Sequence, residues 1–170
     1  MKKTTSIKKQ SGVVLVISMI MLLLLTLIGV TGTQVTTLEE KMAGNARDQN
    51  LAFQAAESAL IDAENDIDNT VGALVPRING STGFDANCTN GLCLNGTGTG
   101  FSSIWNDVAK VSNAVSFGTY TGGSAIPGVA LQPIYLIDAI TSGTARYRIT
   151  AIGYGGTQNA QRILEEIYIP

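Results

Sequence analysis

The hydrophobic positions of this chain are continuous near the N-terminus and then thin out to helical spacing. The run at 13–30, VVLVISMIMLLLLTLIGV, carries no charge. At about 1.5 Å per residue it matches the hydrocarbon core of a bilayer, so we predict a transmembrane helix there. Beyond it, apolar residues alternate with charged ones at helical spacing, which predicts an amphipathic continuation over 31–67. The apolar positions are Leu38, Met42, Ala46, Phe53, Ala56, Leu60, Ala63 and Ile67.

The C-terminal part has the composition and alternation of β-strands. Three segments are rich in β-branched and aromatic residues and are predicted strands: 133–140, 145–152 and 161–169. In the second, Tyr147 and Ile149 alternate with polar residues. Short connections predict antiparallel pairing, and the helix stripe from Phe53 to Ile67 is expected to cover the apolar face of the sheet. The predicted fold class is α+β: a long N-terminal transmembrane and amphipathic α-helix packed on a small C-terminal antiparallel β-sheet in a globular head at 68–170.

Charge is distributed unevenly along the chain. Four lysines lie within residues 2–9, whereas all thirteen acidic residues follow the apolar run. By the positive-inside rule the lysines keep the N-terminus in the cytoplasm, so the chain beyond Val30 is expected outside the inner membrane. After Gly12, seven basic and thirteen acidic residues leave a net charge of −6. This acidic exterior argues against nucleic acid as a partner.

Two simple interpretations fit the hydropathy of the N-terminus. One is a removable secretory signal with small residues at 30–33, although the apolar part of such a signal is normally shorter. The other is a plain single-pass membrane anchor. The junction Gln10-Ser11-Gly12-Val13 favours a third, because polar residues run up to a glycine and unbroken hydrophobicity starts at the next residue.

At this junction the chain resembles a type IV prepilin. In that family a short basic leader ends in glycine, a membrane peptidase cuts after it, and the new N-terminal residue is methylated. The resemblance implies a leader at 1–12, cleavage between Gly12 and Val13, and N-methylation of Val13, where most pilins have Phe. Residues 37–60, TLEEKMAGNARDQNLAFQAAESAL, resemble the N-terminal segment of PilX-type minor pilins. A pilin-like fold, with a long helix on a small sheet, is also what this resemblance implies.

One departure from the pattern of major pilins concerns the fifth mature residue. Most pilins carry Glu there, and its carboxylate is thought to neutralise the terminal amine of the adjacent subunit. Here the residue is Ile17. An unpaired carboxylate within a bilayer is costly, so a subunit with no neighbour above it does better without one. Ile17 therefore predicts a priming or tip subunit with few copies per filament.

The segment from 71 to about 124 is rich in Gly, Asn, Thr and Ser, which is typical of turns and loops. It contains both cysteines, Cys88 and Cys93, with Asn90-Gly91 available for a turn between them. Outside the inner membrane these thiols are expected to be oxidised, which predicts a structural disulfide that shapes a loop. A metal site lacks further ligands, and a redox motif needs a two-residue spacer.

Acidic residues gather near the predicted helix end, where Asp62, Glu64 and Asp66 alternate as in a calcium loop. The sixth position of such a loop is Ile67 instead of Gly, and the twelfth is Ala73 instead of Glu. A solvated helix end is the favoured interpretation. The chain has no histidine and no recognised catalytic motif, so we expect no enzyme, catalytic residue, cofactor or metal.

The resemblance implies a structural minor pilin that helps to initiate a type IV pilus or caps its tip. Its implied partners are other minor pilins and the major pilin through the N-terminal helix, a tip adhesin, the prepilin peptidase and the inner membrane. The head is expected in the periplasm before assembly and at the tip of the extracellular pilus afterwards. The alternatives are a type II secretion pseudopilin and a bitopic membrane-anchored binding protein with no filament role.

Overall fold

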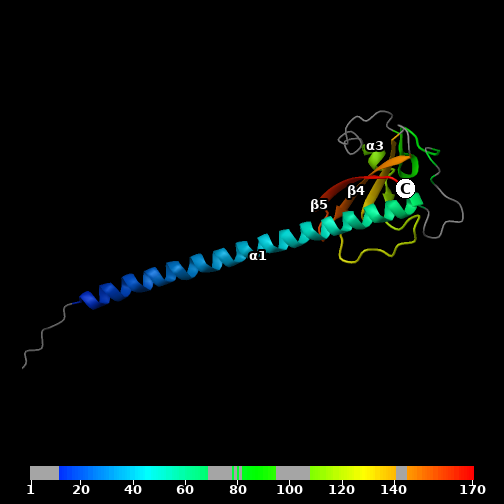
Figure 1. Ribbon diagram of the computed structural model, residues 1–170. Helices are drawn as coiled ribbons and strands as arrows, with labels where there is room; N and C mark the ends of the chain where they lie inside the picture. The colour runs from blue at the N-terminus through cyan, green and yellow to red at the C-terminus, as the bar shows by residue number, and fades with distance from the viewer. Residues whose placement is uncertain (1–11, 69–77, 79, 81, 95–107, 141–144) are drawn as a thin grey trace, which may run out of the picture. The chain divides into compact units, whose positions relative to one another are not determined.

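The computed structural model describes residues 12–68, 78, 80, 82–94, 108–140 and 145–170 (Figure 1). The chain divides into two compact units, Met1–Gly44 and Asn45–Pro170, which we describe separately. The elements in chain order are α1 (Val13–Asp68), η1 (Thr89–Gly91), β1 (Leu92–Cys93), α3 (Val108–Val111), β2 (Val115–Ser116), β3 (Ile134–Ile140), β4 (Arg146–Tyr154) and β5 (Gln161–Tyr168).

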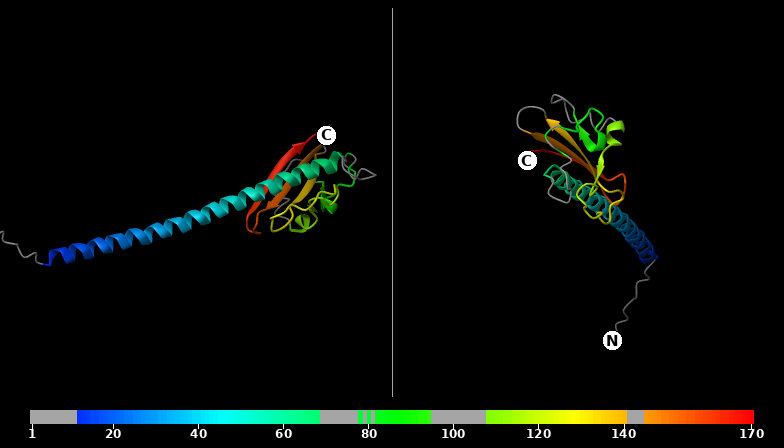
Figure 2. Two further views of the ribbon diagram at one scale, coloured as in Figure 1. Left: turned by 90° about the horizontal axis from the view of Figure 1, so that it is seen from below. Right: turned by 90° about the vertical axis from the view of Figure 1, so that its right-hand side faces the viewer.

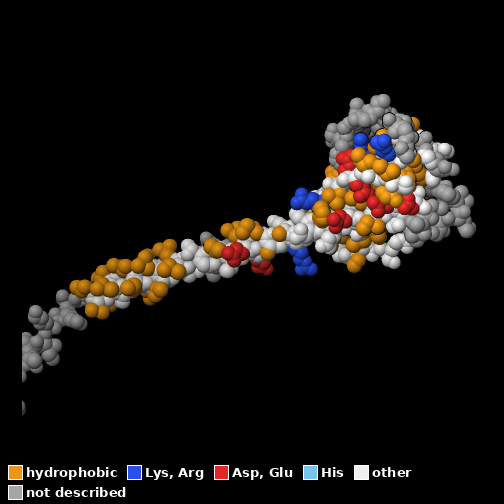
Figure 3. Space-filling view, viewed as in Figure 1, with side chains coloured by type: hydrophobic (Ala, Val, Ile, Leu, Met, Phe, Trp, Pro, Cys, Tyr) orange, Lys and Arg blue, Asp and Glu red, His pale blue; other side chains and the backbone are white. Residues whose placement is uncertain are grey.

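In the first unit, the described residues form the N-terminal part of α1. Its large apolar side chains between 13 and 30 are all exposed, from 49% at Leu24 to 75% at Leu15. Figure 3 shows hydrophobic side chains along this part of the helix, and the first charged ones appear only further along. A helix that is apolar all round and satisfies its own backbone is stable in lipid, where no other partner for the backbone exists.

In the second unit, the strands form one five-stranded sheet in the order β1-β3-β4-β5, with β2 also paired to β3. The three long strands are antiparallel, with Tyr135 opposite Ala151 and Ala151 opposite Leu164. In contrast, β1 runs parallel to β3. The three predicted strands are therefore antiparallel as expected, and β1, for which no strand was predicted, makes the sheet mixed. Short connections fix the direction of β3, β4 and β5, whereas the two residues of β1 come from a distant loop.

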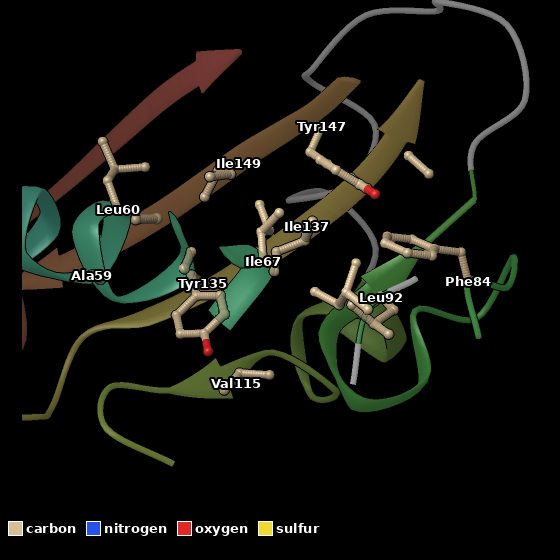
Figure 4. Packing of buried hydrophobic residues seen from close by; sticks show 14 residues of the cluster. Ala59, Leu60, Ile67, Phe84, Leu92, Val115, Tyr135, Ile137, Tyr147 and Ile149 are labelled. Atoms are coloured by element: carbon tan, nitrogen blue, oxygen red, sulfur yellow. The ribbon is translucent and has the colours of Figure 1, made fainter. Parts of the chain in front are cut away.

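The C-terminal part of α1 lies across one face of this sheet and covers the core (Figure 2). Tyr147, Ile149 and Ala151 of β4 are at most 3% exposed, as predicted, but Thr150, expected among the polar positions, is only 1% exposed, so the alternation is lost in the second half of the strand. The three apolar residues pack with Tyr135 and Ile137 of β3 in one buried cluster, part of which Figure 4 shows from close by. The predicted α+β class is confirmed, because a long helix covers a small sheet.

The helix meets the sheet through alanines. Five alanines of α1 are at most 1% exposed and form its flat sheet-facing side: Ala52, Ala55, Ala56, Ala59 and Ala63. Opposite them lies Gly153 of β4, where an added Cβ would stand 2.0 Å from the carbonyl oxygen of Ala52 and 2.3 Å from the amide nitrogen of Ala56. The prediction that Phe53 covers the sheet was wrong, since its side chain is 41% exposed. A bulky ring has no room where the two backbones come this close.

We expect Gly153→Ala to destabilise the head by about 1–3 kcal/mol, because the new methyl group overpacks the contact between helix and strand. Thermal unfolding of the full chain in detergent micelles measures this effect. Gly44→Ala is the matched control, since nothing lies within 4 Å of a Cβ added there. Unfolding of Gly153→Ala at the parent's temperature would contradict the close approach.

Candidate functional site

The junction that the sequence singles out coincides with the start of α1. Gly12 lies just outside the helix, and its carbonyl accepts hydrogen bonds from the backbone N–H groups of Leu15 at 3.1 Å and Val16 at 3.4 Å. Val13 is the first helical residue and Ile17 follows one turn later, both more than half exposed. The Gly12–Val13 peptide bond is thus accessible at a helix terminus, whereas residues 1–11 lie outside the described part of the chain.

The few hydroxyl groups in the apolar run are satisfied within the helix. Ser18 donates to the carbonyl of Leu15 and Thr26 to that of Leu23, each at 2.8 Å. Such internal hydrogen bonds remove the penalty of placing a hydroxyl in hydrocarbon. Among the described residues, α1 is the one helix long and apolar enough to cross a membrane, with a mean hydropathy of 3.1 over its most apolar 18 residues.

In the second unit, carboxylates on one flank of α1 hold loops of the head. Asp48 accepts hydrogen bonds from the backbone N–H of Gly156 and from the hydroxyl of Thr157, the latter at 2.6 Å. The Thr157 hydroxyl, followed by the backbone N–H groups of Gly156 and Thr157, holds the pKa of Asp48 below its ordinary value. This loop follows β4, so Asp48 fixes the turn that leads into β5.

Two further aspartates on that flank are buried. Asp62 is 4% exposed and accepts from the backbone N–H of Gly118, at 2.7 Å, and from the hydroxyl of Thr121. Asp66 is 5% exposed and accepts from the hydroxyl of Tyr135 on β3 at 2.9 Å. The prediction of a solvated helix end was therefore wrong for Asp62 and Asp66, because neutral donors of the head satisfy these carboxylates.

Calcium finds no support in this arrangement. The residues from Asp62 to Asp68 continue as regular α-helix, which cannot wrap its carboxylates around one cation as a calcium loop does. Within the described part of the chain, no group of three acidic or cysteine residues is placed to hold a metal ion. A groove of about 360 Å³ lies beside Asp62, but the carboxylate in its wall is already engaged.

The opposite flank of α1 presents acidic side chains to β5. Burial, followed by the neighbouring negative charge of Glu64, raises the pKa of Glu166 to about 7. One turn of helix further along, Asp68 accepts a hydrogen bond from the hydroxyl of Tyr168, and this bond raises the pKa of Tyr168 to about 12. The two flanks differ in chemistry, since one pairs carboxylates with neutral donors and the other brings two carboxyl groups together.

The predicted disulfide between Cys88 and Cys93 is present. Both residues are fully buried and pack against Leu136 of β3. Asn90 and Gly91 both have positive φ, as expected of the turn between the cysteines, and a Cβ at Gly91 would come within 2.5 Å of the Val115 side chain. The disulfide therefore has a structural role, because it fixes a tight loop against the edge of β3. The two cysteines do not form a reactive thiol pair.

The side chain of Asp85 organises the same loop. It accepts backbone N–H groups of Asn87 at 2.8 Å and Thr89 at 3.1 Å. Hydrogen bonding by Thr89 holds the pKa of Asp85 below its ordinary value. Sequence reasoning missed Asp85, although Asp is a common turn residue because its side chain can bond the backbone N–H two residues on. The rest of the predicted 88–105 loop, from 95 onward, lies outside the described residues.

The raised pKa of Glu166 gives a pH-dependence with a definite sign. Between pH 4.5 and about 7 the folded chain holds a proton that the unfolded chain has lost, so stability falls as pH rises through this window. We expect Glu166→Gln to abolish this fall, so that it melts above the parent at about pH 8 and with it near pH 4. Melting of the full chain in micelles across this range is the measurement, with exposed Glu39→Gln as control. Parallel pH profiles for parent and Glu166→Gln would contradict the assignment.

Comparison with known proteins adds two matches to these observations. The family model described as PilX N-terminal matches residues 11–60. The one described as type IV pilus assembly protein PilX C-term matches residues 89–170. Comparison with curated proteins and with solved structures gave no significant match. The two matched regions contain the apolar run of α1 and all strands of the sheet, so this chain belongs to the PilX family of structural proteins of type IV pilus assembly.

Proposed function

We propose that this chain is a minor pilin that primes assembly of a type IV pilus and caps its tip. The family supports a role in pilus assembly and contacts with other pilus components in general. The finer assignment rests on Ile17, where the apolar part of α1 has no carboxylate. In a bilayer an unpaired carboxylate is costly, so its absence favours a subunit that enters before any neighbour is available to pair with it.

The accessibility of the Gly12–Val13 bond supports processing as a prepilin. In this proposal the leader at 1–12 is removed, Val13 becomes N-methylated, and the helix then passes from lipid into the bundle of pilin helices. Before assembly, the head with its disulfide lies in the periplasm, where oxidising conditions keep the cysteines joined. Other minor pilins, the major pilin and a tip adhesin are the proposed partners in the filament.

Processing is tested by the mass and N-terminal residue of the chain isolated from membranes. We expect a mature chain that starts at methylated Val13 and carries one disulfide when the prepilin peptidase is present, and an uncut chain when it is absent. Gly12→Leu should block cleavage, because the glycine ends the leader, whereas Gly29→Leu, within α1, should leave cleavage intact. A chain that starts beyond Val30 would indicate secretion after signal removal instead.

Position in the filament is tested by labelling. We expect a tag on the exposed loop at 157–159 to mark one end of each pilus, and deletion of the gene to remove surface pili without blocking protein secretion. The loop is suitable because its described residues lie on the surface. Labels all along the shaft would refute a tip position, and a loss of secretion with normal pili would favour the pseudopilin alternative.

A further inference from the structure

Strand β5 leaves one edge of the sheet open. It pairs with β4 from Gln161 to Tyr168, and no other described strand pairs with its second edge (Figure 2). The backbone N–H and C=O groups on that edge form a template for a further strand. On the face turned away from α1, Ile163 and Ile167 are 46% and 61% exposed. An open edge with apolar side chains is a surface that a partner strand can use.

The face of β5 toward α1 brings two carboxyl groups, those of Glu64 and Glu166, close together. Leu164, Glu166 and Tyr168 are partly buried on the side of α1, where Glu64 shares a hydrogen bond with Glu166 and Asp68 accepts one from the hydroxyl of Tyr168. The ion pairs among the described residues include none of these carboxyl groups. One carboxyl oxygen of Glu166, Oε1, is buried without a hydrogen-bond partner among the same residues. A cation placed here would satisfy that oxygen and favour the ionised form of both Glu64 and Glu166.

We propose that the open edge of β5 binds an extended segment of a partner protein by strand addition, and that this segment places a Lys or Arg side chain beside Glu64 and Glu166. A strand added here projects alternate side chains to the two faces of the sheet. Those on the α1 side meet the acidic groups, and those on the other side meet Ile163, Glu165 and Ile167. The preferred segment therefore has a basic residue on the α1 face and, on the other face, apolar residues opposite Ile163 and Ile167 and a polar residue opposite Glu165.

A second copy of this chain satisfies these demands less well. Antiparallel pairing of β5 with β5 supplies a cation only in the register that places Arg162 opposite Glu166. That register sets Ile163 opposite Glu165 on the other face, where an apolar side chain faces a carboxylate. Shifting by two residues brings Ile163 opposite Ile167, but then Glu165 lies opposite Glu165 of the other copy. A segment from a different protein can place a basic residue beside Glu166, apolar residues opposite Ile163 and Ile167, and a polar residue opposite Glu165 at once.

The test appends a strand to the full chain after Pro170. An Asn-Gly turn followed by eight alternating Val and Thr residues, with Thr also at the position opposite Glu165, can fold back on β5 at high effective concentration. In one version the residue opposite Glu166 is Lys, and in the other it is Met. We expect the β5 amides to exchange with solvent at least about tenfold more slowly with the Lys strand than with the Met strand. The pKa of Glu166, followed by carbon NMR, should fall from about 7 toward 4.5 with Lys only.

The double variant Glu64→Gln, Glu166→Gln should remove the difference between the Lys and Met strands, whereas Glu39→Gln should preserve it. Ile167→Lys should weaken protection with either strand, because a charge then replaces the apolar contact. Equal protection by both strands, or none by either, would overturn the proposal. Dimerisation of the unextended chain in micelles with protected β5 amides would overturn it in favour of a second copy. The outcome is independent of leader processing and of position in the pilus.

Discussion

The close approach of the α1 backbone to β4 is the constraint on which the rest of the head depends. A Cβ at Gly153 would lie 2.0 Å from the carbonyl oxygen of Ala52, so helix and strand meet without a side chain between them. This closeness explains why the helix holds the head with aspartates. The short side chains of Asp48, Asp62 and Asp66 reach their donors because the backbones are already near. A substitution that moves the helix away from the sheet lengthens all of these hydrogen bonds together. The contacts between helix and sheet are therefore cooperative.

The two flanks of the helix then play different roles. On the side of β3, the buried carboxylates of Asp62 and Asp66 accept hydrogen bonds from neutral N–H and O–H groups of the same chain. On the side of β5, Glu64 faces Glu166, and burial with this like charge raises the pKa of Glu166 to about 7. The first flank contributes to the stability of the head. On the second flank, the close approach of Glu64 and Glu166 lowers that stability near neutral pH. Such a loss of stability is reasonable at a surface to which another molecule binds, because binding then recovers the stability that folding alone does not provide.

Sequence reasoning predicted the elements whose pattern is local and missed the contacts that depend on distance. The apolar run, the alternation of Tyr147 and Ile149, and the disulfide of Cys88 and Cys93 each have a short-range signal and were correctly assigned. The parallel strand β1 and the exposure of Phe53 were not predicted, because both depend on which residues the sheet brings near. Alanine and glycine are only weakly apolar. The contact of Ala52 with Gly153 therefore gives no maximum of hydrophobicity along the sequence. Acidic residues such as Asp62 resemble solvated ones until the positions of their donors are known.

The apolar surface of α1 and the open edge of β5 are both available to partners in the described part of the chain. They differ in how much selectivity they can provide. The apolar residues between 13 and 30 are exposed all round, with hydroxyl groups such as those of Ser18 and Thr26 bonded within the helix. Lipid tails are as apolar as leucine, so contacts along this segment discriminate weakly between one pilin helix and another. The edge of β5 offers directional backbone groups and a specific charge beside Glu166. We therefore expect the apolar helix to provide entry into any bundle of pilin helices, and the head to decide which partner this subunit accepts.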